Sequence, residues 1–132
     1  MKIFDSNNST WEEKVNFVDD NNVLLGYDTF QSCCENVDWF ISETRITNSN
    51  NFPSKEHKFD LEPYFFDITS LEDNVKITND DWEDDSSGLL IVKLKAKGKP
   101  TLFLHLYNLH NGYYGHGWEL LKNNKQINSG GL

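Results

Sequence analysis

The sequence lacks the features that would tie it to a membrane, a secretory route or a disulfide framework. Its 132 residues include two cysteines, and these are the adjacent Cys33 and Cys34, which excludes a set of structural disulfides. No apolar run approaches the roughly 20 residues that span a bilayer. Residues 1–5 lack the basic and apolar pattern of a signal peptide. We therefore expect a cytoplasmic protein that does not contact a membrane.

Basic residues are also scarce. The chain has 12 Lys and Arg against 21 Asp and Glu, a net charge of −9. Residues 1–88 carry 20 of the acidic and 6 of the basic residues. Because phosphate contacts require Lys and Arg, this composition argues against direct binding of nucleic acid. It favours a basic protein partner, which the charge would attract, although an acidic surface can also serve solubility alone.

Helical periodicity and internal repeats are absent as well, and alternation of apolar and polar residues is the strongest pattern. Residues 90–95 and 102–107 alternate with a period of two, which is typical of half-buried strands. Asn111 and Gly112 separate the second run from a third, and this dipeptide is a strong hairpin signal. The pattern predicts an antiparallel meander of three strands over residues 89–95, 101–109 and 114–121.

A two-residue type I′ turn at Asn111 and Gly112 would also set the register of this meander. Tyr107 would then lie opposite His116, and His105 opposite Trp118, with all four on one face. Gly115 and Gly117 would lie on the other face, beneath a closely packed element. A possible ligand face follows from this register, made of His105, Tyr107, Tyr114, His116 and Trp118.

The rest of the chain is expected to complete a single mainly β domain over residues 1–132. Capping-box spacing after Ser9 and Thr10 leaves open an α+β fold with one or two short helices. The strands could form an open sheet or a small barrel. The expected segments are an N-terminal hairpin at 14–30, a polar loop at 47–58, an acidic loop at 79–88, the meander at 89–121 and a fraying polar tail at 122–132.

Two patches resemble a family of small, uncharacterised bacterial and phage proteins. Residues 27–37, YDTFQSCCENV, are similar to the Cys-Cys-Glu patch that follows an N-terminal hairpin in that family. Residues 111–114, NGYY, are similar to its C-terminal hairpin. The resemblance implies a β-rich fold and carries no activity with it. In size, acidity and lack of a catalytic motif, the chain also resembles the immunity proteins of bacterial toxin systems.

The acidic loop is the strongest binding candidate in the sequence. Several carboxylates around one tryptophan can imitate an array of phosphates and add an apolar anchor, and tryptophan is common at interface hot spots. The alternative is a solvated linker whose tryptophan packs into the core. The predicted partner-binding residues are Asp80, Asp81, Trp82, Glu83, Asp84 and Asp85.

Motifs for metal binding and catalysis are weak. His105 and His116 could converge on one ion in the predicted register, but two histidines with two tyrosines and a tryptophan are more often a cross-strand packing cluster than a metal site. Adjacent cysteines do not have zinc-ligand spacing. Cys34 could act as a nucleophile with a histidine as its base and Glu35 to orient that base, but no spacing in the sequence indicates such an arrangement. We therefore expect neither metal, cofactor nor catalysis.

These observations predict an acidic inhibitor that binds a protein partner. The most concrete form is an immunity protein that neutralises a basic toxin domain, such as a nuclease, by occluding its active site. The first alternative is a small-ligand or metal-binding protein that uses the His105 face. The second is an uncharacterised hydrolase of phage type.

Overall fold

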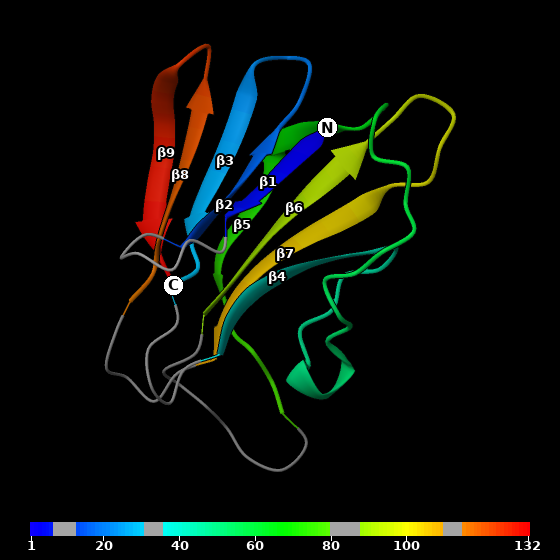
Figure 1. Ribbon diagram of the computed structural model, residues 1–132. Helices are drawn as coiled ribbons and strands as arrows, with labels where there is room; N and C mark the ends of the chain where they lie inside the picture. The colour runs from blue at the N-terminus through cyan, green and yellow to red at the C-terminus, as the bar shows by residue number, and fades with distance from the viewer. Residues whose placement is uncertain (7–12, 31–35, 80–87, 110–114) are drawn as a thin grey trace.

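Two antiparallel sheets face each other in the computed structural model, which describes residues 1–6, 13–30, 36–79, 88–109 and 115–132 (Figure 1). The strand orders are β1-β2-β3-β8-β9 and β4-β7-β6-β5. The mainly β class is confirmed, and these strands form two sheets rather than a closed barrel. No helix in the described ranges is long and apolar enough to cross a membrane. The elements are β1 Lys2–Ser6, β2 Lys14–Val18, β3 Val23–Asp28, β4 Asn36–Ser42, the 3₁₀ helix η1 Ser49–Asn51, β5 Phe65–Val75, β6 Gly88–Lys95, β7 Leu102–Leu109, β8 Gly117–Lys122 and β9 Lys125–Gly131.

The predicted C-terminal meander is wrong in its last pairing, because β7 and β8 belong to different sheets. β6 and β7 pair as expected, but the other neighbour of β7 is β4. β8 lies between β3 and β9, with Trp118 opposite Tyr27. The expected pairs of Tyr107 with His116 and of His105 with Trp118 therefore do not form. Asn111 and Gly112, on which that register depended, lie outside the described residues.

The physical reason is that both strands have an apolar face to bury, and facing sheets bury both. Alternate residues of β7 and β8 point into the space between the sheets and share one core. Burial of such apolar surface supplies about 25 cal/mol per Å². The core members from these two strands are Leu102, Leu104, Leu106, Trp118 and Leu120, all at most 3% exposed.

The other face of the second sheet is covered by the segment between β4 and β5. Phe52 packs on Phe40 and Tyr107, with ring centroids 4.9 and 5.0 Å apart. Further along, the His57 ring makes a T-shaped contact with Trp39, whose side chain belongs to the core between the sheets. The expected polar loop at 47–58 thus wraps around the β4 edge and covers apolar surface on both of its sides.

The C-terminal tail does not fray, which corrects a second expectation. Residues 125–131 form β9, paired with β8, and Leu132 is 6% exposed. The connection between the two strands is a two-residue hairpin loop at Asn123 and Asn124, with φ of 52° and 65°. Two consecutive positive φ angles are the requirement of a type I′ turn, and asparagine tolerates them better than most residues.

We expect Asn124→Val to destabilise the protein by about 1–3 kcal/mol, because a β-branched residue is strained at positive φ. Asn124→Gly should be neutral or slightly stabilising, since glycine adopts this conformation freely. The free energy of unfolding from urea titration measures both. Equal midpoints for the two variants would contradict a type I′ turn at this position.

Close packing over glycine occurs at positions other than the two expected. Gly115 and Gly117 are exposed, so the expectation that they lie beneath a packed element is wrong. At Gly130, by contrast, an added Cβ would lie 2.8 Å from Nε1 of Trp118. At Gly26 it would lie 2.8 Å from Oδ1 of Asn16. Gly130 makes room for the core tryptophan, and Gly26 lies under polar side chains on the opposite face of the sheet.

Candidate functional site

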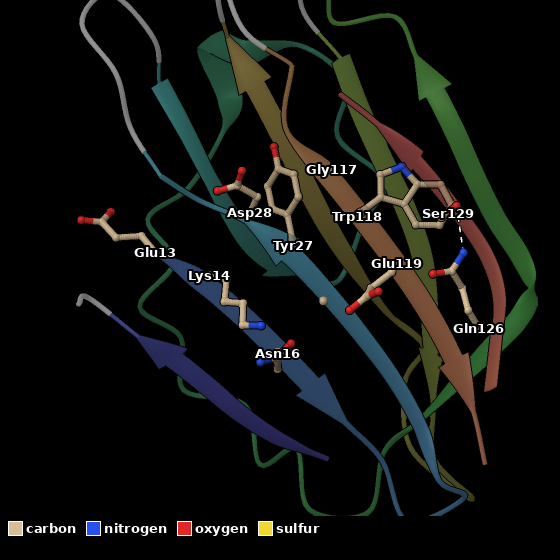
Figure 2. A pocket seen from close by; sticks show the side chains of 11 residues that line it. Glu13, Lys14, Asn16, Tyr27, Asp28, Gly117, Trp118, Glu119, Gln126 and Ser129 are labelled. Carbon is tan, nitrogen blue, oxygen red and sulfur yellow. Dashed lines mark hydrogen bonds between the residues drawn. The ribbon is translucent and has the colours of Figure 1, made fainter. Parts of the chain in front are cut away.

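The outer face of the first sheet carries a shallow groove of about 400 Å³. Its floor follows from the strand register: Gly26 of β3 lies between Asn16 of β2 and Glu119 of β8, and Ser129 of β9 comes next in the same row. Because strand residues alternate between faces, these positions are on the side opposite the core. Figure 2 shows the side chains of Asn16, Glu119 and Ser129 on neighbouring strands around the groove.

The floor of the groove has no side chain at Gly26. Cγ and Oε1 of Glu119 lie 3.6 and 3.7 Å from the position that a Cβ of Gly26 would take. Asn16 reaches the same position from the other side. A Cβ at Gly26 would therefore displace the Asn16 amide and would lie in van der Waals contact with Glu119. The missing side chain lets the amide of Asn16 and the carboxylate of Glu119 approach each other over the sheet.

The charged groups that line the groove are mostly acidic, beside the apolar surface of Tyr27 and Trp118. Glu13, Asp28 and Glu119 contribute carboxylates, and Lys14 contributes the one ammonium group among the lining residues. Neither Glu13 nor Glu119 forms an ion pair within the part of the chain that the structure describes. Amide and hydroxyl groups complete the wall, with Nε2 of Gln126 donating to Oγ of Ser129 at 3.3 Å (Figure 2). Such a lining is suited to cationic and hydrogen-bonding groups.

Asp28 is held in place by its neighbours while half of its side chain stays exposed. Its Oδ1 accepts from the backbone N–H of Phe30 at 2.9 Å. Nδ1 of the buried His116 donates to the Asp28 carbonyl oxygen at 3.1 Å and lies 3.8 Å from Oδ2. The Asp28 side chain is 50% exposed. His116 therefore fixes the end of β3, and the carboxylate remains accessible from the groove.

The predicted ligand face is not assembled. His105 and Tyr107 lie on β7 in the second sheet, whereas Trp118 points into the core from β8 in the first. His116 is buried beside Asp28. Tyr114 lies outside the described residues. The structure therefore separates the residues that the expected hairpin would have brought together.

His105 is a buried structural residue with both ring nitrogens occupied. Nε2 accepts from the backbone N–H of Ile46 at 3.0 Å, and Nδ1 donates to the carbonyl of Phe103 at 3.1 Å. The ring stacks on Phe40 with centroids 4.1 Å apart. Burial lowers the pKa of His105 to about 4. Burial likewise raises the pKa of Tyr107 to about 12.

A second group of charged residues, at the β1 and β4 edges, also has a structural explanation. Lys55 Nζ lies 3.0 Å from Oδ2 of Asp5 and 3.6 Å from Oδ1 of Asp38. The indole N–H of Trp39 donates to the same Asp5 oxygen at 3.2 Å. Burial raises the pKa of Asp38, and Lys55 opposes that effect. These contacts fasten the wrapping loop to the two sheets.

The remaining sequence candidates lie where the structure gives no description. The predicted partner-binding residues Asp80, Asp81, Trp82, Glu83, Asp84 and Asp85 are among them, as are Cys33 and Cys34. Within the described ranges, no group of three His, Cys, Asp or Glu side chains could hold a metal ion.

Sequence reasoning missed the groove, although part of its signal was present. Alternation through the 14–30 hairpin already places Lys14, Asn16, Gly26 and Asp28 on one face. Glu119 joins them through a pairing between β3 and β8 that spans most of the chain. No known protein family, curated protein or solved structure matches the chain.

Proposed function

We propose that the protein is an acidic inhibitor that binds a basic protein partner, and that it acts as an immunity protein against a toxin domain. One observation carries the proposal: the groove on the outer face of the first sheet presents three carboxylates against one ammonium group. The outer face of the second sheet is covered by the segment between β4 and β5. The outer face of the first sheet is therefore the one that a partner could contact directly.

The proposed mechanism is occlusion. A nuclease binds its substrate through Lys and Arg side chains that contact phosphates. Carboxylates of an inhibitor can occupy the positions that those phosphates would take. Complementary charge also accelerates encounter between the two proteins, which favours rapid neutralisation in the cell that makes both. No chemical step by the inhibitor is required.

Growth rescue tests this function directly. The toxin candidate is the C-terminal domain encoded by the gene next to that of this protein. We expect its expression alone to stop growth, co-expression of this protein to restore growth, and the two proteins to co-elute as a 1:1 complex. Growth arrest that persists despite soluble expression of this protein would contradict the proposal.

The groove should govern the rate of association. We expect Glu13→Lys with Glu119→Lys to slow association with the toxin domain about 10-fold at low salt and to weaken its salt dependence. The control reverses two exposed residues away from the groove, Glu56→Lys with Glu62→Lys, which changes the net charge equally. Stopped-flow fluorescence measures the rates. Equal slowing by both pairs would show that net charge, and not the groove, controls binding.

The acidic loop remains a second predicted contact. Reversing Asp80, Asp81, Asp84 and Asp85 to Lys should also slow association with the toxin domain and reduce its salt dependence. An unchanged rate at low salt would remove this loop from the interface. The groove prediction does not depend on that outcome, because the two sets of residues are tested in separate variants.

A further inference from the structure

Strand β9 is an outer strand whose second half, residues 128–131, has little protection. It pairs on one side with β8, lies at the edge of the first sheet, and all seven of its residues are exposed (Figure 1). Proteins usually protect such edges with charges, prolines, bulges or very short strands. β5, at an edge of the second sheet, has two register shifts and three acidic residues. β9 carries one charged residue, Lys125, and one register shift at Ile127, both in its first half, whereas residues 128–131 pair with β8 in regular register.

The backbone of β9 offers hydrogen-bonding groups to a further strand. Leu132 and His116 exchange both backbone hydrogen bonds, each 2.8 Å long. In an antiparallel pair such residues alternate with residues that point away, so Ser129 and Gly131 direct their N–H and C=O groups to the open side. The side chain of Asn128 accepts from the Ser129 N–H at 2.9 Å. The Gly131 groups have no partner among the described residues.

The open edge borders the anionic groove. Ser129 is both an edge residue and part of the groove wall, and Glu119 lies directly opposite it on β8. Neighbouring strands are about 4.8 Å apart, so a strand added to β9 would lie about 10 Å from β8. A Lys or Arg side chain on that strand, lying across Ser129, would point toward Glu119 of β8. The Glu119 carboxylate leans over Gly26 of β3 in this structure, so an ion pair with the added strand requires Glu119 to turn toward β9 (Figure 2). The edge supplies affinity through the backbone, and the groove supplies the preference for a basic residue.

We propose that β9 takes up an extended strand of a basic partner by β-augmentation, with a Lys or Arg side chain of that strand lying over Ser129 toward Glu119. This inference rests on the proposed function and specifies how the partner binds. The incoming strand would displace the Asn128 side chain from the Ser129 N–H and take its place as acceptor. Backbone pairing at an open edge is an established mode of peptide recognition.

A synthetic peptide probe tests the inference without the natural partner. The peptide has nine residues that alternate threonine and arginine, and its control replaces each arginine with glutamate. We expect the arginine peptide to shift the amide resonances of Ser129 and Gly131 and to slow hydrogen exchange at Gly131. It should bind at least 5-fold more tightly than the glutamate peptide. Equal affinities, or shifts confined to other strands, would overturn the proposal.

Two variants locate the contact. Ser129→Pro removes an outward N–H and obstructs a further strand, while the pairing with β8 does not use that group. Gly131→Pro removes the next outward N–H along β9. It replaces Ser129→Pro in the test if that variant fails to fold. Either folded variant should bind the arginine peptide at least 10-fold more weakly. Glu119→Gln should weaken binding about 5-fold, and Glu62→Gln, at an exposed site away from β9, should leave it unchanged. Full affinity in a folded proline variant would refute strand addition.

The same variants separate this inference from the proposed function. If Ser129→Pro still neutralises a toxin domain with wild-type affinity, β-augmentation is wrong and the immunity function stands. If the arginine peptide docks at β9 but no toxin domain is neutralised, strand addition stands and the immunity function is wrong. The oligomeric state of the free protein, measured by sedimentation, provides a third test. A wild-type dimer that Ser129→Pro converts to a monomer would show that the edge serves a second copy of the chain, contrary to the proposal.

Discussion

Asp19→Ala is expected to destabilise the protein by about 3–5 kcal/mol, a large part of a domain's usual 5–15 kcal/mol. The Asp19 side chain is 5% exposed and accepts three backbone hydrogen bonds. Oδ1 accepts from Asn21 at 2.9 Å and Val23 at 3.0 Å, which closes the turn between β2 and β3. Oδ2 accepts from Phe66 of β5 at 2.9 Å, which joins the first sheet to the second. Alanine leaves three donors without an acceptor.

Two variants provide the comparison for Asp19→Ala. Asp19→Asn keeps one oxygen for the turn but presents an amide N–H to the Phe66 donor, so it should lose about 1–3 kcal/mol. Asp20→Ala changes the exposed neighbour and should have little effect. Urea unfolding followed by tryptophan fluorescence measures all three. A loss below about 1 kcal/mol in Asp19→Ala would show that the buried carboxylate does not join the sheets.

Acidification should remove about 3 kcal/mol of stability through His105 alone. The folded-state pKa of about 4 lies below the value of about 6.5 in an unfolded chain, so the unfolded state binds the proton more tightly. The stabilisation by neutral His105 is thus complete above pH 6.5. It is lost progressively as the pH falls from 6.5 to 4, and no further loss from this residue follows below that. Protonation of Nε2 would replace the acceptor for the Ile46 backbone N–H with a second donor, and the hydrogen bond between them would be lost.

Carboxylates also titrate at the acidic end of this range, so the test compares two proteins. His105→Gln keeps an acceptor for Ile46 and removes the titrating group. Its free energy of unfolding should be lower than that of the wild type at pH 7.5, and the difference should shrink by about 2–3 kcal/mol by pH 4.5. Chemical denaturation at several pH values measures it. A difference that stays constant with pH would mean that His105 titrates normally in the folded protein.

The sequence predicted strands more reliably than their partners, for a physical reason. Alternation with a period of two shows that a strand has one buried face. The same alternation is expected whether the next strand in the sequence pairs with it or belongs to the facing sheet. The leucines of β7 and Trp118 of β8 satisfy both arrangements. Local turn chemistry suggested the first arrangement, whereas burial of two apolar faces in one core produces the second.

Other features were missed because their signals are polar or long-range. β9 has no apolar alternation, so the two asparagines before it were the available sign of a hairpin. The sequence predicted His105 and Tyr107 on one face of β7, but the partners of His105 are Phe40 of β4 and the backbone N–H of Ile46, which no local pattern indicates. The groove needs Glu119 beside Gly26, and that contact joins segments more than 90 residues apart.

Carboxyl footprinting of the complex tests the central claim, that the outer face of the first sheet binds the partner. Carbodiimide-driven labelling with glycine ethyl ester, read by mass spectrometry, reports the accessibility of each carboxylate in the free protein and in the complex with the toxin domain. We predict that Glu13, Asp28 and Glu119 are labelled in the free protein and protected in the complex, while Glu56 and Glu62 remain labelled in both. Unchanged labelling of the three groove carboxylates in a 1:1 complex would contradict the account.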